Sequence, residues 1–280
     1  MSAKHALWVS LVCLLLLVAV PVRAEEVVVR IENPSGNDGI FFTPVWVGFH
    51  EGGFDLFDAG TVAPAGGVLE RLAEDGDVEA LQADFAARVP DGVGGFVVAP
   101  EGFPDVPVFD PGDTGSAAFE LDPSQNRYMS FAAMVVPSND AFIGNDDPMG
   151  IELFDAAGNF TGPRTIRILG TDVWDAGTEL NNEMDAAFIN QGAPNTGVAT
   201  VEPIGAHPGF IGSFANPSPG RDPIILGAQV DTDFFIDPVA ADFTRPGYVV
   251  AEITIVPEPA TVVLLMAGSV SLLRRRRRTH

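Results

Sequence analysis

The chain has 280 residues and a formal net charge of −23, with 38 acidic residues against 15 basic ones. Such an excess of negative charge repels nucleic acid and anionic lipid, and it attracts cations. The one cysteine, Cys13, lies near the N-terminus, so disulfides cannot stabilise the rest of the chain. Acidic surfaces also keep secreted proteins soluble, so charge alone does not identify a cation-binding protein.

The first 24 residues have the three parts of a secretory signal peptide. Lys4 precedes an apolar run over residues 6–20, and Ala24 supplies the small residue before the cleavage point. We expect signal peptidase to cut after Ala24, so that Glu25 begins the mature chain. The alternative is an uncleaved membrane anchor, but the apolar run is shorter than the about 20 residues that a bilayer span needs.

Residues 25–256 form a body that holds 37 of the acidic residues and only eight arginines, a formal charge of about −29. A β-branched run over 26–32 predicts the first strand, which stops at a turn of Asn, Pro, Ser and Gly. A second apolar run covers 41–49. Apolar residues at helical spacing then predict two short helices, one at 69–76 closed by a glycine and one at 77–87.

The second half of the body again favours strands. A near-continuous apolar run over 127–136 predicts a buried central strand, an apolar segment follows at 151–154, and a shorter strand is expected at 165–169. Residues 191–231 are rich in Gly, Pro and Asn and are expected to form long loops. An alternating strand over 248–255 closes the domain. Short strands, turns and little helix predict an all-β fold, an antiparallel β-sandwich with one or two short helices.

Residues 257–280 open with the motif Pro257-Glu258-Pro259 and continue with an apolar run to residue 273 and five consecutive arginines. We expect the apolar run to form a hydrophobic helix, with the arginines on the cytoplasmic side of the inner membrane. This combination resembles the PEP-CTERM sorting signals of Gram-negative bacteria. The resemblance implies transient anchoring in the inner membrane, cutting near the motif by a membrane-embedded exosortase, and export to the cell envelope or an extracellular polysaccharide matrix. An ordinary C-terminal anchor is the alternative.

Two loops that follow strands carry carboxylates. Asp140 lies on the first, and Asp175 and Glu179 lie four residues apart on the second, across an Ala-Gly-Thr turn. That spacing lets one loop turn both carboxylates toward a common centre. Calcium prefers about six to eight oxygen ligands, which loops at one end of a sandwich can supply. The alternative is that these carboxylates only cap turns, as Asp does readily.

The same two loops resemble motifs of the spondin N-terminal domain family. In that family a strand ends in Val-Pro-Ser-x-Asp-x-Phe-x-Gly, and Trp-Asp-Ala-Gly-Thr-Asp follows later. The chain matches the first motif over 136–144 and the second over 174–178. The resemblance runs from about Val27 to Ile255, and it implies a β-sandwich with a calcium ion bound at one end.

The resemblance also implies which residues would hold the ion. Asp140, Asp175 and Glu179 fall on the family's ligand positions, although Glu179 replaces the usual Asp and lengthens the side chain by one methylene group. A further acidic ligand of the family precedes the first motif. Asp122 or Glu120 is the candidate for that position.

Other chemistries have less support in the sequence. The body has no lysine, so a phosphate-binding loop of the Gly-Lys-Ser/Thr type is absent. A zinc site needs clustered His or Cys, whereas His50 and His207 are far apart in sequence. We expect each histidine to be a satisfied surface or core residue.

These observations favour a non-catalytic, calcium-binding adhesion module, secreted to the cell surface or extracellular matrix. Its partners would be signal peptidase and exosortase for processing, and an extracellular polysaccharide or surface protein for adhesion, but not nucleic acid. Adhesion by animal relatives is only a fold-level analogy. One alternative is a secreted hydrolase acting on matrix polysaccharide, which would need two carboxylates lining a cleft. Another is a purely structural matrix protein whose charge serves solubility.

Overall fold

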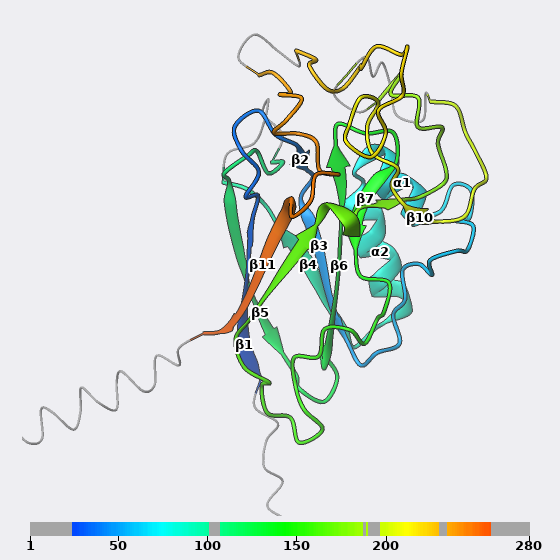
Figure 1. The fold of residues 1–280 in the computed structure, drawn as a ribbon. Helices are drawn as coiled ribbons and strands as arrows, with labels where there is room; N and C mark the ends of the chain where they lie inside the picture. Colours follow the sequence, from blue (N-terminus) through cyan, green and yellow to red (C-terminus); the bar gives the residue numbers. More distant parts are fainter. Residues whose placement is uncertain (1–23, 101–106, 187–188, 190–196, 230–233, 259–280) are drawn as a thin grey trace, which may run out of the picture.

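A computed structural model describes residues 24–100, 107–186, 189, 197–229 and 234–258. Two antiparallel sheets pack face to face, with two short helices, so the predicted all-β sandwich is confirmed (Figure 1). Residues 1–23 of the predicted signal peptide and the predicted C-terminal hydrophobic helix lie outside the described residues. Within the described residues, no helix combines the length and apolar character needed to cross a membrane.

The first sheet has four strands and is built around the N-terminal strand. Its inward residues Val27, Val29 and Ile31 are fully buried, while Glu26 and Arg30 face solvent, which is the alternation expected of a sheet with one covered face. The strand order is β5 (Thr114–Leu121), β1 (Glu25–Glu32), β11 (Val249–Pro257), β8 (Arg164–Leu169).

The second sheet is centred on β6, which is buried along nearly its whole length. Its core face packs on the first sheet, and its other face is covered by the helices (Figure 1). Burial on both faces explains the unbroken apolar run in this strand. The strand order is β10 (Gly205–Ala206), β9 (Trp174–Asp175), β7 (Ala141–Gly144), β6 (Tyr128–Val136), β3 (Val45–His50), β4 (Val93–Val97), and β2 (Phe41–Phe42) also pairs with β6.

The two helices, α1 (Val68–Asp75) and α2 (Val78–Arg88), are joined by a sharp turn. Gly76 ends α1 in the left-handed region at φ 68°, and the Asp77 carboxylate caps α2 by accepting the Ala80 N–H at 2.9 Å. Trp46 of β3 packs beneath α2, edge-on to Phe85, and donates its indole N–H to Gln82 at 2.8 Å. Both predicted helices are thereby confirmed.

Several strands lie in segments where the sequence predicted none. β4 and β5 fall in the Gly-rich part of the chain after the helices, where glycine and small residues interrupt the apolar ones. Segment 151–154 makes only isolated bridges, through Glu152 and Phe154. The predicted loop at 191–231 is irregular wherever it is described, apart from the two residues of β10.

His50, at the end of β3, is fully buried and satisfied on both ring nitrogens. Its Nε2 lies 2.9 Å from the Ser130 hydroxyl, and its Nδ1 accepts the Gly52 N–H at 2.9 Å. Burial lowers the pKa of His50 to about 4. The fold therefore holds the neutral imidazole, as expected for a satisfied core histidine.

We predict that His50 makes the protein acid-sensitive. The unfolded chain takes up a proton on this residue near pH 6.5 and the folded chain only near pH 4, so its contribution to stability is lost as pH falls between those values. His50→Gln should lower the urea midpoint at pH 7.5, and its difference from wild type should shrink at pH 4.5. Ser130→Ala breaks the same hydrogen bond without removing a titratable group, so its effect should be the same at both pH values. A His50→Gln effect that is independent of pH would contradict the prediction.

Candidate functional site

The turn between β6 and β7 places a carboxylate in the protein interior. Ser138 closes this turn, because its hydroxyl donates to the Val135 carbonyl at 2.6 Å and accepts the Ala141 N–H at 3.1 Å. The turn leaves Asp140 with no exposed surface. A buried aspartate requires compensating partners.

The partners of Asp140 come from the second motif loop. Its Oδ2 accepts the backbone N–H groups of Thr178 at 2.9 Å and Glu179 at 3.0 Å, and its backbone carbonyl accepts the Ala176 N–H at 3.1 Å. β7 pairs with β9, which sets Ala141 opposite Asp175. The two loops are therefore adjacent. The other carboxylate oxygen of Asp140, Oδ1, is buried and has no hydrogen-bond partner.

The two carboxylates of the second loop flank this aspartate. Asp175 is half-buried, and its oxygens accept the Gly177 N–H at 2.8 Å and the side-chain amide of Asn181. Glu179 is buried, and its Oε2 accepts the Asn139 amide at 3.2 Å. The structure thus places Asp140, Asp175 and Glu179 on adjacent loops at one end of the sandwich.

Helix α1 adds a fourth carboxylate that sequence reasoning missed. Glu74, in the last turn of α1, is buried and hydrogen-bonds the Thr178 side chain. That turn contains no basic residue, so the Glu74 carboxylate lies at the negative end of the helix dipole. The only signal available in the sequence was an acidic residue beside Ala73, next to the apolar face of the helix.

Burial and mutual repulsion make these carboxylates hard to ionise. Burial raises the pKa of Asp140 to about 7, with a further contribution from the Asp175 charge. Burial likewise raises the pKa of Glu179 and of Glu74 to about 7 each, with a further contribution from the Asp140 charge at Glu179 and from the Glu179 charge at Glu74. The pKa of Asp175 is also raised, again mainly by burial. None of the ion pairs formed among the described residues involves these four side chains.

The donor set is chemically suited to a hard cation. Carboxylate oxygens are what calcium prefers, and the free oxygen of Asp140 is a buried acceptor without a donor. The oxygens are not gathered around one point, since no group of three or more His, Cys, Asp or Glu in the described part of the chain is arranged to hold a metal ion. Calcium ligation by these residues stays a prediction.

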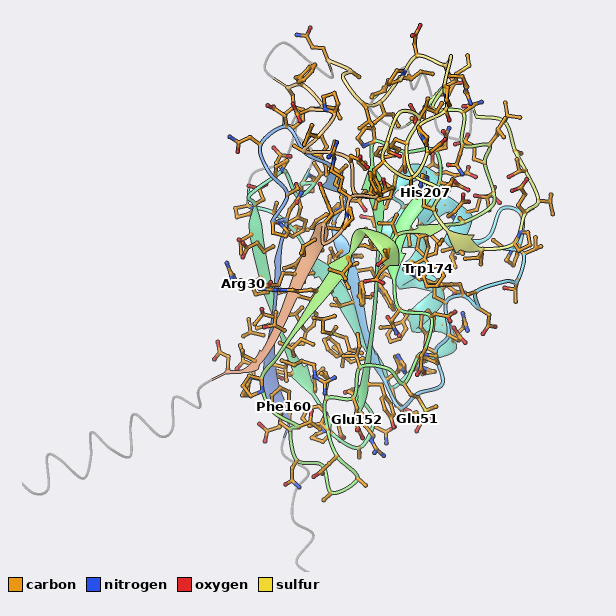
Figure 2. The ribbon with its side chains drawn as sticks, viewed as in Figure 1. Arg30, Glu51, Glu152, Phe160, Trp174 and His207 are labelled. Atoms are coloured by element: carbon orange, nitrogen blue, oxygen red, sulfur yellow. The ribbon has the colours of Figure 1, made fainter. Side chains whose placement is uncertain are left out.

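Asp122 and Glu120, the candidates for a further ligand, lie at the other end of β6. Asp122 precedes this strand and Asp140 follows it, so about 26 Å of strand separates them. Asp122 instead caps a turn by accepting the N–H and hydroxyl of Ser124 at 2.8 and 2.7 Å. Neither residue joins the cluster. In Figure 2, Glu152, which bridges to the start of β6, marks that distant end, and His207 marks the end that carries the site.

The residues predicted to be involved in processing also lie at that distant end. Ala24 is exposed directly before β1, and Glu25 is the first residue of the strand. Pro257 ends β11, and Glu258 follows it. Pro259 lies outside the described residues.

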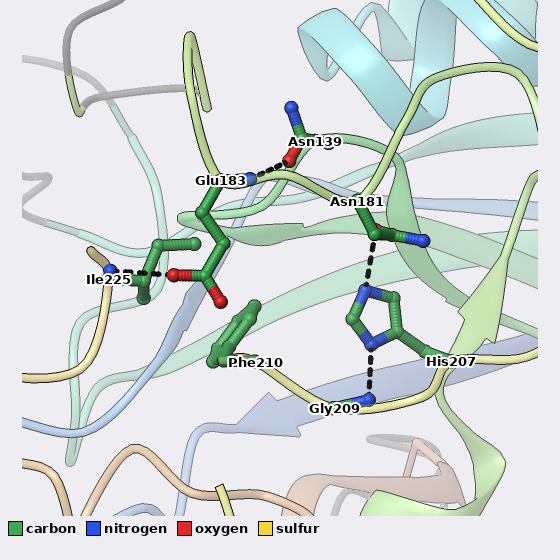
Figure 3. A pocket seen from close by; sticks show the side chains of 7 residues that line it. All are labelled: Asn139, Asn181, Glu183, His207, Gly209, Phe210 and Ile225. Carbon is green, nitrogen blue, oxygen red and sulfur yellow. Dashed lines mark hydrogen bonds between the residues drawn. The ribbon is translucent and has the colours of Figure 1, made fainter. Parts of the chain in front are cut away.

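A narrow hollow adjoins the acidic cluster through Asn139 and Asn181 (Figure 3). His207 lines it and is satisfied on both nitrogens, by Asn181 at 3.1 Å and the Gly209 N–H at 3.0 Å, and burial lowers its pKa to about 4. The empty volume of the hollow is about 190 Å³, below the roughly 300–1,000 Å³ that is typical of ligand pockets.

Glu183 anchors the long loops over this hollow. Its carboxylate accepts backbone N–H groups from Ile211, Ile224 and Ile225, the last at 2.9 Å, and its own N–H donates to Asn139 at 2.8 Å. The residue is buried and adopts a positive φ of 62°. Glu183 therefore ties loops distant in sequence to the site.

Two family models match the chain. The model described as Spondin_N matches residues 33–204, which is more than half of the chain and includes both motif loops. The model described as the PEP-CTERM protein-sorting motif matches residues 256–278. No curated protein matches the chain significantly.

We predict that Asp140 destabilises the protein at high pH in the presence of a chelator. Its folded pKa lies above its unfolded value, so the penalty is present above about pH 7 and is relieved as pH falls. Asp140→Asn, which retains an acceptor for the two N–H groups, should therefore raise the melting temperature at pH 8 and lose this advantage at pH 5. Asp122→Asn removes the same charge at the other end of β6 and should give no such gain. A lower melting temperature for Asp140→Asn at pH 8 would contradict this.

We also predict that Glu183 is a structural anchor. Glu183→Gln replaces one acceptor oxygen by an amide that cannot accept, so buried N–H groups lose their partner at a cost of roughly 2–3 kcal/mol of unfolding free energy. Urea denaturation measures this loss. Glu202→Gln, on an exposed part of the same loop system, should change stability by less than about 0.5 kcal/mol. Equal losses of unfolding free energy in the two variants would contradict the role of Glu183 as a structural anchor.

Proposed function

The chain belongs to the spondin N-terminal domain family, and we propose that it is a non-catalytic adhesion module whose loop end is organised by a calcium ion. Its PEP-CTERM motif makes it a secreted protein of the Gram-negative cell envelope, sorted by exosortase-type machinery. Calcium and adhesion are the parts that we add to this framework.

The observation that carries the calcium proposal is the unpartnered Oδ1 of Asp140. This oxygen is fully buried, and Asp175, Glu179 and Glu74 surround it with further negative charge. In a native protein such an atom requires an explanation, and an ion is one of the few that also offsets the repulsion. Asp140, Asp175 and Glu179 would hold the ion, with Glu74 beside them.

A bound calcium ion would neutralise the cluster and link three parts of the chain. These parts are the turn before β7, the loop after β9 and the end of α1. The protein would thereby gain a cross-link of the kind that disulfides supply in other secreted domains, which its mature body cannot form. The described residues of 176–186 and 197–229 would then present a fixed surface to an extracellular polysaccharide or surface protein.

We predict that calcium raises the melting temperature of the purified protein at pH 7.5. Calcium at 100 times its dissociation constant stabilises the fold by about 2.7 kcal/mol. Asp175→Ala should remove most of this gain, since it deletes a ligand of the ion. Asp122→Asn is the matched control, because it lies outside the cluster and should respond to calcium as wild type does. Identical melting curves in calcium and in chelator would contradict calcium binding.

The adhesion part needs its own readout. We expect wild type to co-sediment with the extracellular matrix of the producing cells in calcium, and less of it to do so after chelation or with Asp175→Ala. Release of reducing sugar from that matrix by wild type would instead identify a hydrolase. Saturable thermal stabilisation by calcium without any matrix binding would support the calcium ion and contradict the adhesion function.

A further inference from the structure

The sorting motif begins inside the sandwich. The sequence matched by the sorting-motif model starts at residue 256, whereas β11 continues to Pro257. Pro257 lies opposite Val27 of β1, and the Glu258 N–H donates to the Glu26 carbonyl at 2.9 Å. Pro257 is therefore the last residue of β11 in the first sheet, and Glu258 is hydrogen-bonded to that sheet beside the start of β1.

The position of Pro257 explains how a sheet accommodates this motif. In an antiparallel pair, positions alternate between hydrogen-bonded and non-hydrogen-bonded, and the Glu258–Glu26 bond makes the Pro257–Val27 position non-hydrogen-bonded. The missing N–H of Pro257 would point away from β1, toward the β8 side of β11. No β8 residue pairs with Pro257, because Arg164, the first residue of β8, pairs with Ile255. The proline thus sits where a sheet tolerates it.

The pairing at this end is weakened by like charges. Glu26 lies directly opposite Glu120 of β5, and on its other side the β1–β11 register sets it opposite Glu258. All three side chains are exposed. None of the ion pairs recorded for the described residues includes any of them. Directly opposed like charges destabilise a strand pair, so this row of glutamates favours separation of the strand ends.

We propose that the sandwich restrains its own sorting motif, so that processing requires the end of β11 to separate from β1, and that the glutamate row sets how readily it separates. An enzyme that cuts a chain must engage an extended segment through backbone groups. The backbone at Glu258 is already committed to β1, so the sheet and the enzyme compete for it. This inference rests on the sorting motif and is independent of the proposed calcium ion.

A disulfide that locks the strand ends tests the proposal. Val28 and Val256 form a directly opposite pair on the outer face, with a Cα separation of about 5.5 Å that suits a disulfide. The mature body contains no other cysteine. In the native host, Val28→Cys with Val256→Cys should slow removal of the tail at least tenfold, and reductant should restore the wild-type rate. The fraction of processed chain is measured by mass spectrometry.

The matched control locks the same strand to its other neighbour. Thr165 of β8 and Thr254 of β11 are also directly opposite, with hydroxyl oxygens 3.3 Å apart. A disulfide at Thr165→Cys with Thr254→Cys leaves the β1 pairing of the motif unchanged, so processing should proceed at the wild-type rate. Equal processing rates for the Val28–Val256 variant and wild type under oxidising conditions would overturn the proposal.

The glutamate row is tested without cysteines. Glu26→Lys places a positive charge between Glu120 and Glu258, so it should slow both tail removal and hydrogen exchange of the Glu258 amide in the purified full-length chain. Glu32→Lys, near the other end of β1, makes the same charge change and should alter neither. If the Glu258 amide of wild type exchanges at the rate of an unpaired amide, the restraint does not exist, whatever calcium does to stability.

Discussion

One buried carboxylate holds the loop end of this sandwich together. Asp140 accepts two backbone N–H groups from the loop after β9, and thereby joins the turn between β6 and β7 to a segment almost forty residues later. The same burial sets its charge against Asp175 and Glu74. The two hydrogen bonds therefore hold Asp140 in the interior, whereas burial and the neighbouring charges disfavour its ionised form. A cation is the simplest way to reconcile them, and that tension underlies the function we propose.

The fold was predictable where the sequence carries a strong local signal. β1, β6 and β11 have β-branched or continuous apolar runs, and the helices have a glycine stop and an aspartate cap. β4 and β5 have no such signal. In β4 two glycines interrupt the apolar residues, and β5 opens with Thr, Gly, Ser and Ala. These segments are strands because neighbouring strands supply their hydrogen-bond partners, which is a tertiary effect.

The same distinction applies to the site. Asp140, Asp175 and Glu179 could be grouped from sequence because each belongs to a motif directly joined to β7 or β9, and those strands pair. Glu74 could not, because only the packing of α1 against β6 and β7 brings it there. Asp122 was assigned because the family resemblance implies a further acidic ligand before the first motif. That reasoning failed because β6 intervenes and carries the two residues to opposite ends of the sheet.

The place of β11 in the first sheet has a consequence for how the protein is made. This last strand lies between β1, the first, and β8, so the sheet cannot close until residues 249–257 are available. A chain that enters the periplasm from its N-terminus would keep β1 without one of its two partners until translocation is nearly complete. Contacts between such distant segments also slow folding. Because the first sheet completes late, the chain stays incompletely folded while it passes through a translocation channel. During that interval β1 lacks one strand partner, and a chaperone could shield its unpaired edge.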